Sequence, residues 1–429
     1  MAKRTPKPPR APKPRASRRA LQDVQGLPRS PLGSQYRRKL DKLGLPARGP
    51  LLRRLKIFLP GNWFAWGWEY AKNRIGFRHP FPSYDLAPGS SDLGVYRLGD
   101  LSSIGGAADL AGEVRVSLAG DWGTGTQEAE RVAEIMRRFD PHFTLHLGDV
   151  YYVGGREEVE SNCLGASSDG YQGVRWPLGS VGSFSLNGNH EMYARGYGYF
   201  DVLLPKLGMR PAPGQPPRGQ HASYFCLEND FWRLVALDTG YNSISFPLVE
   251  DLIEPSSRLR REEVRWVRQV VQPAKDKRGL ILLTHHQYYS DFEGQFEEPA
   301  RQLARSIERP VIWYWGHEHR LAVYGLYGRQ KLKAWGRCVG HGGMANERKP
   351  PARRKCGLVL YDDRPYPPLP ALTYNGLLNL RFKGPTLHVD YRDVDDTQLL
   401  TESWSVDVAT GKLDGPNLGN IHPELTRGK

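Results

Sequence analysis

Five short polar segments, spread over roughly half of the sequence, carry residue types that bind metal ions. They are Asp121-Trp122-Gly123, Gly148-Asp149-Val150-Tyr151-Tyr152, Gly188-Asn189-His190-Glu191, Thr284-His285-His286 and Gly316-His317-Glu318-His319. Carboxylate, imidazole and amide groups are the ligands of hard and borderline metals. One carboxylate shared by two ions can hold them roughly 3.5–4 Å apart, and Asp149 is the best candidate for that bridge. Two adjacent ions indicate hydrolysis of a phosphate ester.

Each polar segment follows a short apolar run that is typical of a buried strand. The predicted strands are residues 114–118, 143–147, 184–186, 280–283 and 311–315. Ligands of open α/β sheets bind outside the carboxyl ends of the strands, so we expect five strand ends to deliver these side chains to one crevice. In extended backbone, residues i and i+2 point to the same side, which lets His317 and His319 bind neighbouring ions.

The surrounding sequence indicates an α/β fold. Residues 128–139 have apolar side chains at helical spacing between two predicted strands, which makes a βαβ unit. Further helices are expected at 258–271 and 297–307. The chain then turns strand-rich, and its alternating pattern predicts an antiparallel sheet that closes the same domain. These last strands are expected at 357–361, 377–382, 386–391 and 402–408.

The positive charge of the chain lies at its N-terminus. The 429 residues have a net charge of +14. Residues 1–60 contain seventeen Lys and Arg against Asp23 and Asp41, a net charge of about +15. The rest of the chain is therefore close to neutral, and the basic composition does not by itself indicate a nucleic-acid-binding protein.

Four regions are expected along the chain. Residues 1–50 are rich in Pro, Lys and Arg, which predicts a disordered basic arm. Residues 51–111 form an aromatic-rich strap. We favour docking of this strap on the folded body over an interfacial membrane segment, because aromatic clusters more often mark packing. Residues 112–410 are the main domain, and residues 411–429 are expected to be a C-terminal tail.

The cysteines and the N-terminal sequence indicate a cytoplasmic protein. The four cysteines show no metal-binding spacing, and a chain with a core this large does not need disulfides. No apolar segment follows the basic N-terminus and none is long enough to cross a membrane, so neither a signal peptide nor a transmembrane helix is expected. Contact of residues 1–60 with a polyanion, or peripheral attachment to an anionic membrane, is an alternative role for the arm.

The ordered set of five motifs resembles the calcineurin-like metallophosphoesterase superfamily, over about residues 113–395. The resemblance implies a four-layer α/β-β-α sandwich, in which helices flank two mixed sheets. Two details are similar to the purple acid phosphatase branch. The first motif is Asp121-x-Gly123 where most members have Asp-x-His, and the second is Gly148-Asp149-x-x-Tyr152.

The resemblance also implies a role for each site residue. Site one would use Asp121, Asp149, Tyr152 as a phenolate, and His319. Site two would use Asp149, Asn189, His285 and His317. His190 matches the outer-sphere histidine that contacts the substrate or the leaving group, and His286 is a second catalytic candidate, with a structural hydrogen bond as its alternative. A tyrosine ligand implies iron at site one, paired with zinc or manganese.

The sequence departs from that branch in several places. Residues 291–294 lack the further histidine of purple acid phosphatases, and residues 1–110 do not resemble the N-terminal β-domain of the plant enzymes. His341 lies on a Gly-rich turn where the family has a loop near the metals, and we favour a structural role for it. Shared metal geometry therefore does not imply a shared substrate.

The expected activity is that of a binuclear metal-dependent phosphoesterase. The two ions would orient the phosphoryl group, and water acidified by them would attack phosphorus in line. No covalent intermediate is expected, because no nucleophile pairs with a base in these motifs. A phosphatase is favoured over a phosphodiesterase or nuclease acting through the same site. The alternative outside the enzymes is a scaffold that binds a polyanion or a membrane through the arm.

Overall fold

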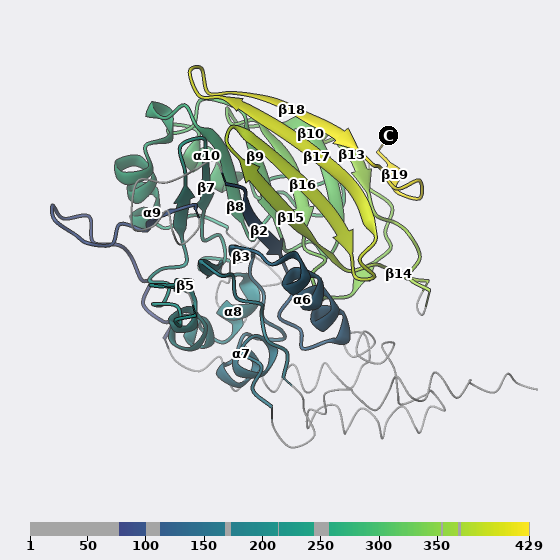
Figure 1. Cartoon of the computed structure of the whole chain (residues 1–429), viewed down its shortest axis with the longest axis horizontal. Helices are drawn as coiled ribbons and strands as arrows, with labels where there is room; N and C mark the ends of the chain where they lie inside the picture. The colour runs from purple at the N-terminus through teal and green to yellow at the C-terminus, as the bar shows by residue number, and fades with distance from the viewer. Residues whose placement is uncertain are drawn as a thin grey trace, which may run out of the picture.

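The computed structural model describes residues 77–99, 112–167, 173–212, 214–243, 257–352, 355–367 and 370–428. The predicted basic arm, residues 1–50, and the first part of the predicted strap, residues 51–76, lie outside the described residues. Two large sheets face each other, and helices lie against part of the outer surface of each (Figure 1).

The larger sheet has nine strands in the order β1-β6-β7-β8-β9-β11-β10-β13-β19. The segment β6-β7 is antiparallel, whereas β7, β8, β9 and β11 run parallel to one another. The bounds of the nine strands are β1 Val95–Arg97, β6 Phe225–Glu228, β7 Trp232–Ala236, β8 Gly279–Thr284, β9 Val311–Trp315, β10 Leu321–Tyr327, β11 Ala334–Val339, β13 Leu358–Tyr361 and β19 Thr426–Arg427.

The second sheet has eight strands in the order β18-β17-β16-β15-β2-β3-β4-β5. The strands β2, β3 and β4 are parallel, and the C-terminal strands β15 to β18 extend the same sheet in antiparallel register. Their bounds are β2 Val114–Ala119, β3 Phe143–His146, β4 Gly182–Ser185, β5 Gly208–Met209, β15 Gly376–Lys383, β16 Thr386–Asp393, β17 Gln398–Asp407 and β18 Lys412–Gly419. A small ribbon pairs β12 Asn346–Glu347 with β14 Leu372–Thr373.

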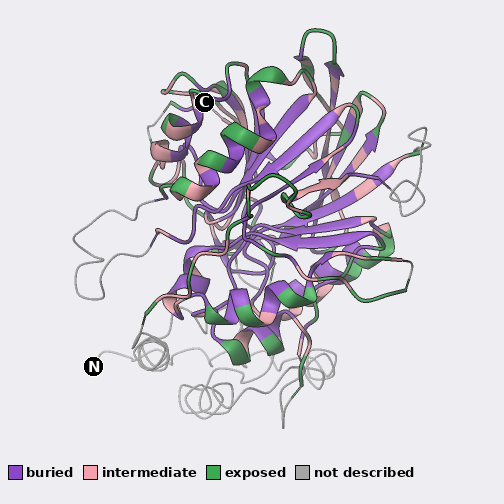
Figure 2. Ribbon diagram, turned by 90° about the vertical axis from the view of Figure 1, so that its left-hand side faces the viewer, coloured by how far each residue is buried: buried purple, intermediate pink, exposed green. Residues whose placement is uncertain are grey.

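Three buried apolar clusters define the layers. One lies between the sheets and combines side chains of both, such as Leu118 of β2 and Leu283 of β8. The second joins the nine-stranded sheet to helices α9 and α10, and the third joins the eight-stranded sheet to α6 and α7. Buried residues accordingly fill the middle of the molecule in Figure 2, and exposed residues lie along the outer helices. The predicted α/β sandwich of two mixed sheets is confirmed.

The helices are short, and α6 is the longest of those described. The bounds are α6 Gln127–Phe139, α7 Arg156–Asn162, α8 Asn189–Tyr193, α9 Arg261–Trp266 and α10 Glu297–Leu303, with π-helical turns η1 Tyr199–Leu203 and η3 Val267–Val271 and 3₁₀ turns η2 Leu204–Lys206 and η4 Pro273–Lys275. No helix in the described ranges has the length and apolar character that crossing a bilayer requires.

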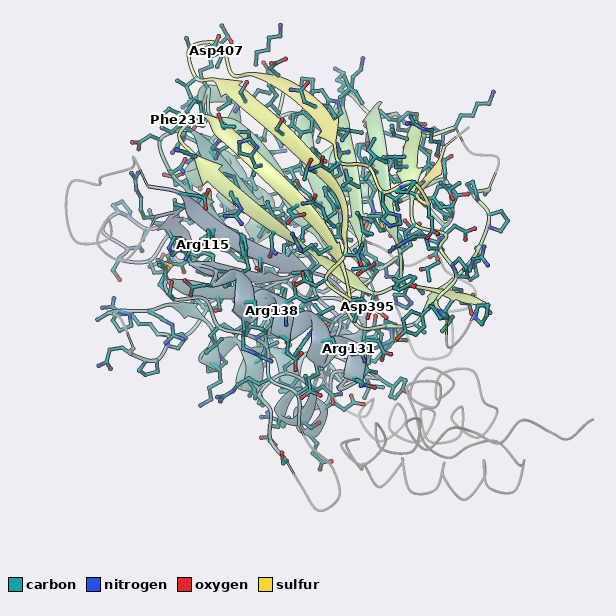
Figure 3. The ribbon with its side chains drawn as sticks, turned by 45° about the vertical axis from the view of Figure 1, so that its right-hand side comes forward. Arg115, Arg131, Arg138, Phe231, Asp395 and Asp407 are labelled. Carbon is teal, nitrogen blue, oxygen red and sulfur yellow. The ribbon has the colours of Figure 1, made fainter. Side chains whose placement is uncertain are left out.

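Helix α6 shows how the sequence fixes the βαβ unit. Thr126 caps its first turn by accepting a hydrogen bond from the N–H of Ala129, and Asp140 ends it in the left-handed region. Its apolar face packs on the eight-stranded sheet. On the outer face, Arg131 lies 3.4 Å from Asp395 in the turn after β16 (Figure 3). Helix α6 is thereby attached both to the parallel strand β2 and to the antiparallel C-terminal strands of this sheet.

Two terminal regions contribute strands to the sheets. The C-terminal residues predicted as a tail instead form β18 at one edge of the eight-stranded sheet and β19 at one edge of the nine-stranded sheet. Near the other end, residues 77–99 lie on the body. Tyr84 is buried in the cluster under α9, and β1 pairs in parallel with β6.

Candidate metal centre

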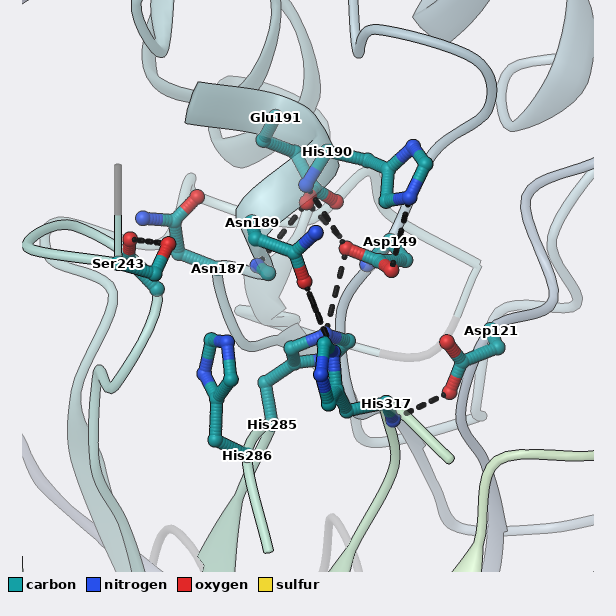
Figure 4. A network of polar contacts seen from close by, with 12 residues as sticks. Asp121, Asp149, Asn187, Asn189, His190, Glu191, Ser243, His285, His286 and His317 are labelled. Carbon is teal, nitrogen blue, oxygen red and sulfur yellow. Dashed lines mark hydrogen bonds and ion pairs between the residues drawn. The ribbon is translucent and has the colours of Figure 1, made fainter. Parts of the chain in front are cut away.

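The five polar segments lie where the two sheets meet. Three follow the parallel strands β2, β3 and β4 of one sheet, and two follow the parallel neighbours β8 and β9 of the other. The carboxyl ends of these strands point to the same edge, so the loops that follow them converge (Figure 4). The expected convergence of five strand ends is thus present in the fold.

The loops hold unusual backbone conformations. Asp121, Asp149 and His317 have φ of 57°, 73° and 67°, which non-glycine residues adopt rarely and mostly at functional sites. Gly148 precedes Asp149 with φ of 97°, and a Cβ there would lie 2.9 Å from the ring Nδ1 of His285. At Gly188 a Cβ would lie 2.1 Å from Asp149 Oδ1. Only glycine allows the loops to approach the carboxylate this closely.

Hydrogen bonds from the main chain orient the two carboxylates. Asp121 Oδ2 accepts from the N–H of His317 at 2.8 Å, and Asp149 Oδ1 accepts from the N–H of His190 at 3.0 Å. The buried Glu191 joins two motifs, because its Oε2 accepts from the N–H groups of Gly188 at 2.9 Å and of Asp149 at 3.2 Å. Asp121 Oδ1 and Asp149 Oδ2 are left to face the crevice.

The first group of donor atoms surrounds a phenol. The hydroxyl oxygen of Tyr151 lies 2.7 Å from Asp121 Oδ1, 3.0 Å from Asp149 Oδ2 and 3.0 Å from His319 Nε2. His319 Nε2 is itself 3.5 Å from Asp121 Oδ1. These are the residues expected at site one, with one exception.

The exception is the tyrosine. The expected residue was Tyr152, whereas the phenol among the site-one atoms belongs to Tyr151. The main chain of Tyr152 has other contacts: its N–H donates to Glu158 Oε1 at 2.6 Å, and its carbonyl oxygen lies 2.5 Å from His190 Nδ1. Two adjacent tyrosines follow Asp149, and the path of the loop decides which one turns inward. The sequence spacing alone could not show this.

The second group of donor atoms lies on the other side of Asp149. His285 Nε2 is 3.3 Å from Asp149 Oδ1 and 3.1 Å from Asn189 Oδ1. His317 Nδ1 is 3.0 Å from the same oxygen of Asn189. The Nδ1 of His285 lies 2.8 Å from the carbonyl oxygen of Leu147 and donates its proton there, which leaves Nε2 as the nitrogen that faces Asp149 and Asn189.

The spacing of the donor atoms fits metal ions. Ligands about 2.1 Å from an ion lie about 3.0 Å apart when neighbours in an octahedron, and about 3.4 Å apart in a tetrahedron. The donor separations in both groups, from 2.7 to 3.5 Å, agree with these values. One atom each from Asp121, Asp149 and His285 also lies within 4.8 Å of the other two. Asp149 belongs to both groups through its two oxygens.

The electrostatics of the crevice favour ligand forms of the side chains. Burial raises the pKa of Asp149, but the charges of His285 and His190 outweigh burial and lower the pKa well below its usual range. Burial lowers the pKa of His285, yet Asp149 reverses this and raises it to about 10. Burial and the charge of His285 lower the pKa of His317 to about 3. His285 thus carries a proton that an ion would replace, and His317 is neutral.

The two predicted catalytic histidines take different places. His190 is the more exposed, with 18% of its side chain accessible, and its Nε2 lies 3.8 Å from Asp149 Oδ2. His286 is buried beside His317. His341 is also buried and packs near Gly376, whereas its neighbour Gly340 approaches Asp121. The Gly-rich turn thus reaches the site through a glycine and not through His341.

Comparison with known proteins assigns the family. The calcineurin-like phosphoesterase family matches residues 114–321, a range that contains the five strands and every predicted ligand. No curated protein matches the sequence.

Among solved structures, the chain is similar to GAP50, the anchor in the inner membrane complex of Plasmodium, at 12% identity over 69% of this chain and 89% of that one, with a TM-score of 0.46. It is also similar to PhoD, at 12% identity over 72% of this chain and 73% of that one, with a TM-score of 0.41. Likenesses this distant say nothing about function. Because the family match covers these strands and loops, residues 114–321 form a calcineurin-like phosphoesterase domain.

Proposed function

We propose that this chain is a binuclear metal-dependent hydrolase of phosphate esters. The observation that supports this most strongly is the position of Asp149. Its Oδ2 faces Tyr151 and its Oδ1 faces His285, at 3.0 and 3.3 Å. A carboxylate with one oxygen toward each of two donor groups is suited to bridge two ions.

The residues divide into two ligand sets around Asp149. Site one consists of Asp121, Asp149, His319 and Tyr151, which takes the place first expected for Tyr152. Site two consists of Asp149, Asn189, His285 and His317. When bound, two ions would neutralise phosphoryl charge and acidify water. The identity of the ions is proposed from the ligands. A phenol favours iron at site one, and the imidazole nitrogens of site two suit zinc better than manganese.

His190 is proposed as the proton donor for the leaving group. Its Nδ1 donates to the Tyr152 carbonyl oxygen, which fixes the ring and leaves Nε2 at the partly exposed side of the crevice. Because Nδ1 already holds a proton, donation from Nε2 to the leaving oxygen of an ester requires the cationic ring. Burial lowers the pKa of His190, so the proposed role operates at acidic pH. The ring also packs against Tyr151 in a tilted arrangement, with centroids 4.4 Å apart, so both motifs position it.

A phosphomonoester is proposed as the substrate class. The reason is the similarity of the Asp-x-Gly motif to purple acid phosphatases, together with a phenol in site one, although this phenol belongs to Tyr151 and not to the motif position Tyr152. Phosphodiesters are the alternative, because mono- and diesterases of this family share the same motifs.

The test is turnover of p-nitrophenyl phosphate and bis(p-nitrophenyl) phosphate after loading the protein with iron, manganese or zinc. Faster turnover of the monoester supports a phosphatase, and faster turnover of the diester supports a phosphodiesterase. The matched control is Asp149→Asn, which keeps the shape of the side chain and removes the bridging charge. Activity that Asp149→Asn retains, or no turnover of either ester by wild-type protein with any metal, would contradict the proposal.

A further inference from the structure

A third buried histidine lies beside the imidazoles of site two. His286 follows His285 directly, and it is 2% exposed. Its ring centroid lies 4.9 Å from that of His285 and 4.5 Å from that of His317 (Figure 4). One ring nitrogen of each of the three histidines lies within 4.8 Å of the other two. The three rings therefore lie around one small volume.

The hydrogen bonds of His286 leave one ring nitrogen available. The main-chain N–H of His286 donates to Thr239 Oγ1 at 3.0 Å, and the ring Nδ1 lies 3.1 Å from the same oxygen. A hydroxyl oxygen has two lone pairs. In the tautomer that a ligand role requires, Thr239 accepts from both N–H groups and the ring proton lies on Nδ1. The Nε2 atom is buried and has no hydrogen-bond partner among the described residues. An unpaired buried polar atom costs about 1–3 kcal/mol, and a ligand would remove that cost.

We propose that His286 Nε2 is a third imidazole ligand of site two, beside His285 and His317. The inference rests on the proposed function, because it requires that site two binds an ion. The three nitrogens lie within 4.8 Å of one another, whereas neighbouring ligands of one ion lie about 3.0–3.4 Å apart. Binding an ion would therefore draw the three rings together by about 1 Å.

The consequence is metal selectivity. Imidazole suits zinc, whereas magnesium and manganese prefer carboxylate, carbonyl and water oxygens. Site one offers one imidazole, from His319, and the rest of its donors are oxygens. Site two would offer three imidazoles with the oxygens of Asn189 and Asp149. His286 is therefore the residue that makes site two select zinc over manganese.

The test compares zinc and manganese affinities of the full chain. Zinc is titrated against a chromophoric chelator and manganese by calorimetry, for wild type, His286→Gln and His341→Gln. His341 is the matched control, since it is buried to a similar degree and also has an unpartnered ring nitrogen among the described residues. In His286→Gln the zinc affinity should fall by about 10–100-fold and the manganese affinity much less. His341→Gln should keep both affinities.

A second pair of variants tests the role of Thr239. Thr239→Val removes the acceptor that fixes the ring proton on Nδ1, and Thr239→Ser keeps it. The valine variant should lose part of the zinc affinity, and the serine variant should bind zinc as wild type does. Equal zinc affinity in both variants would contradict the proposed tautomer and with it the ligand role.

Other outcomes separate this inference from the proposed function. If wild type binds two ions but folded His286→Gln keeps its zinc affinity, or loses zinc and manganese equally, His286 is not a ligand. If wild type binds no ion, the proposed function fails as well. If His286→Gln does not fold, X-ray absorption of zinc-loaded wild type decides. A zinc ion with three imidazoles supports the inference, and fewer than three contradict it.

Discussion

Two buried polar clusters of this molecule use their charges differently. Arg337 of β11 and Glu402 of β17 join the two sheets, and both side chains are fully buried. Two hydrogen bonds of 2.9 Å connect them, and Glu402 also accepts from the Tyr391 hydroxyl at 2.7 Å and from the Trp404 indole. The remaining Arg337 nitrogen donates to the carbonyl oxygens of Tyr324 and Gly336. Every polar atom of this pair has a protein partner.

The candidate metal centre differs, because some of its buried polar atoms have no protein partner among the described residues. Its two aspartates face each other across one phenol. Buried atoms of Asn187, Glu191 and His286 lack hydrogen-bond partners among the described residues. Three of its residues also hold left-handed backbone, which costs of order 1–3 kcal/mol each. The Arg337 cluster is satisfied by protein groups alone, whereas the unpartnered atoms of the candidate centre agree with the proposed binding of metal ions.

The largest effect on activity is expected from the shared carboxylate. Asp149→Ala removes an oxygen from each ligand set, so both ions should be lost and phosphate-ester turnover should fall to background. The fold should survive, because the variant removes charge from a crowded crevice. Metal analysis, turnover and circular dichroism check this. Retention of both ions by the variant would show that Asp149 is not the bridge.

Substitution in the Arg337–Glu402 pair is expected to lower stability and to leave metal binding unchanged. Arg337→Met leaves the Glu402 charge buried without its partner, which should lower the free energy of unfolding by about 3–5 kcal/mol. Urea denaturation measures the loss, and metal content at low temperature should not change. The double variant Arg337→Met/Glu402→Leu should be more stable than the single variant. A stability loss below that of an ordinary surface substitution would contradict this view of the cluster.

Substitution of His190 should lower turnover without loss of the metal ions. His190→Ala should retain both ions and lose about two orders of magnitude in turnover, because it removes a proton donor and no ligand. Steady-state kinetics and metal analysis on the same preparation test this. Loss of metal in this variant would make His190 part of a ligand set.

Substitutions of the two tyrosines should affect the visible absorption of the iron-loaded protein differently. A phenolate bound to ferric iron absorbs visible light, so oxidised, iron-loaded protein should be violet or pink. Tyr151→Phe should bleach it and Tyr152→Phe should not, because the Tyr151 hydroxyl lies among the site-one atoms. Bleaching by Tyr152→Phe alone would show that the iron ligand is Tyr152, the residue that the motif spacing predicts. A colourless, active, iron-loaded wild-type protein would exclude both tyrosines as ligands of ferric iron.

The smallest effect is expected from the N-terminal arm. Deletion of residues 1–50 should leave metal binding and turnover of small esters nearly unchanged, since these residues lie outside the family match. Binding of nucleic acid or anionic vesicles should be strongly salt-dependent for the intact chain and absent after the deletion. Equal binding by both proteins, or none by either, would contradict a polyanion role.

The sequence predicted the strands that carry the site because each is a short apolar run followed by polar residues. β9 at Val311–Trp315 has the predicted bounds, and β8 differs by one residue at each end. β18 was not predicted, because its residues alternate between exposed and half-buried and form no apolar face. Its partner β17 supplies the backbone hydrogen bonds. The positions of Tyr151 beside Asp121 and of Thr239 beside His286 could not be predicted for a similar reason, since they depend on the paths of loops.

The most direct test of the account is electron paramagnetic resonance of the manganese-loaded protein, measured together with metal content. Two ions that share the Asp149 carboxylate must be magnetically coupled. The account predicts two manganese ions per chain with an exchange-coupled spectrum in wild type, and loss of that coupled spectrum in Asp149→Ala. One manganese per chain, or two ions with the spectrum of isolated manganese, would contradict a binuclear centre bridged by Asp149.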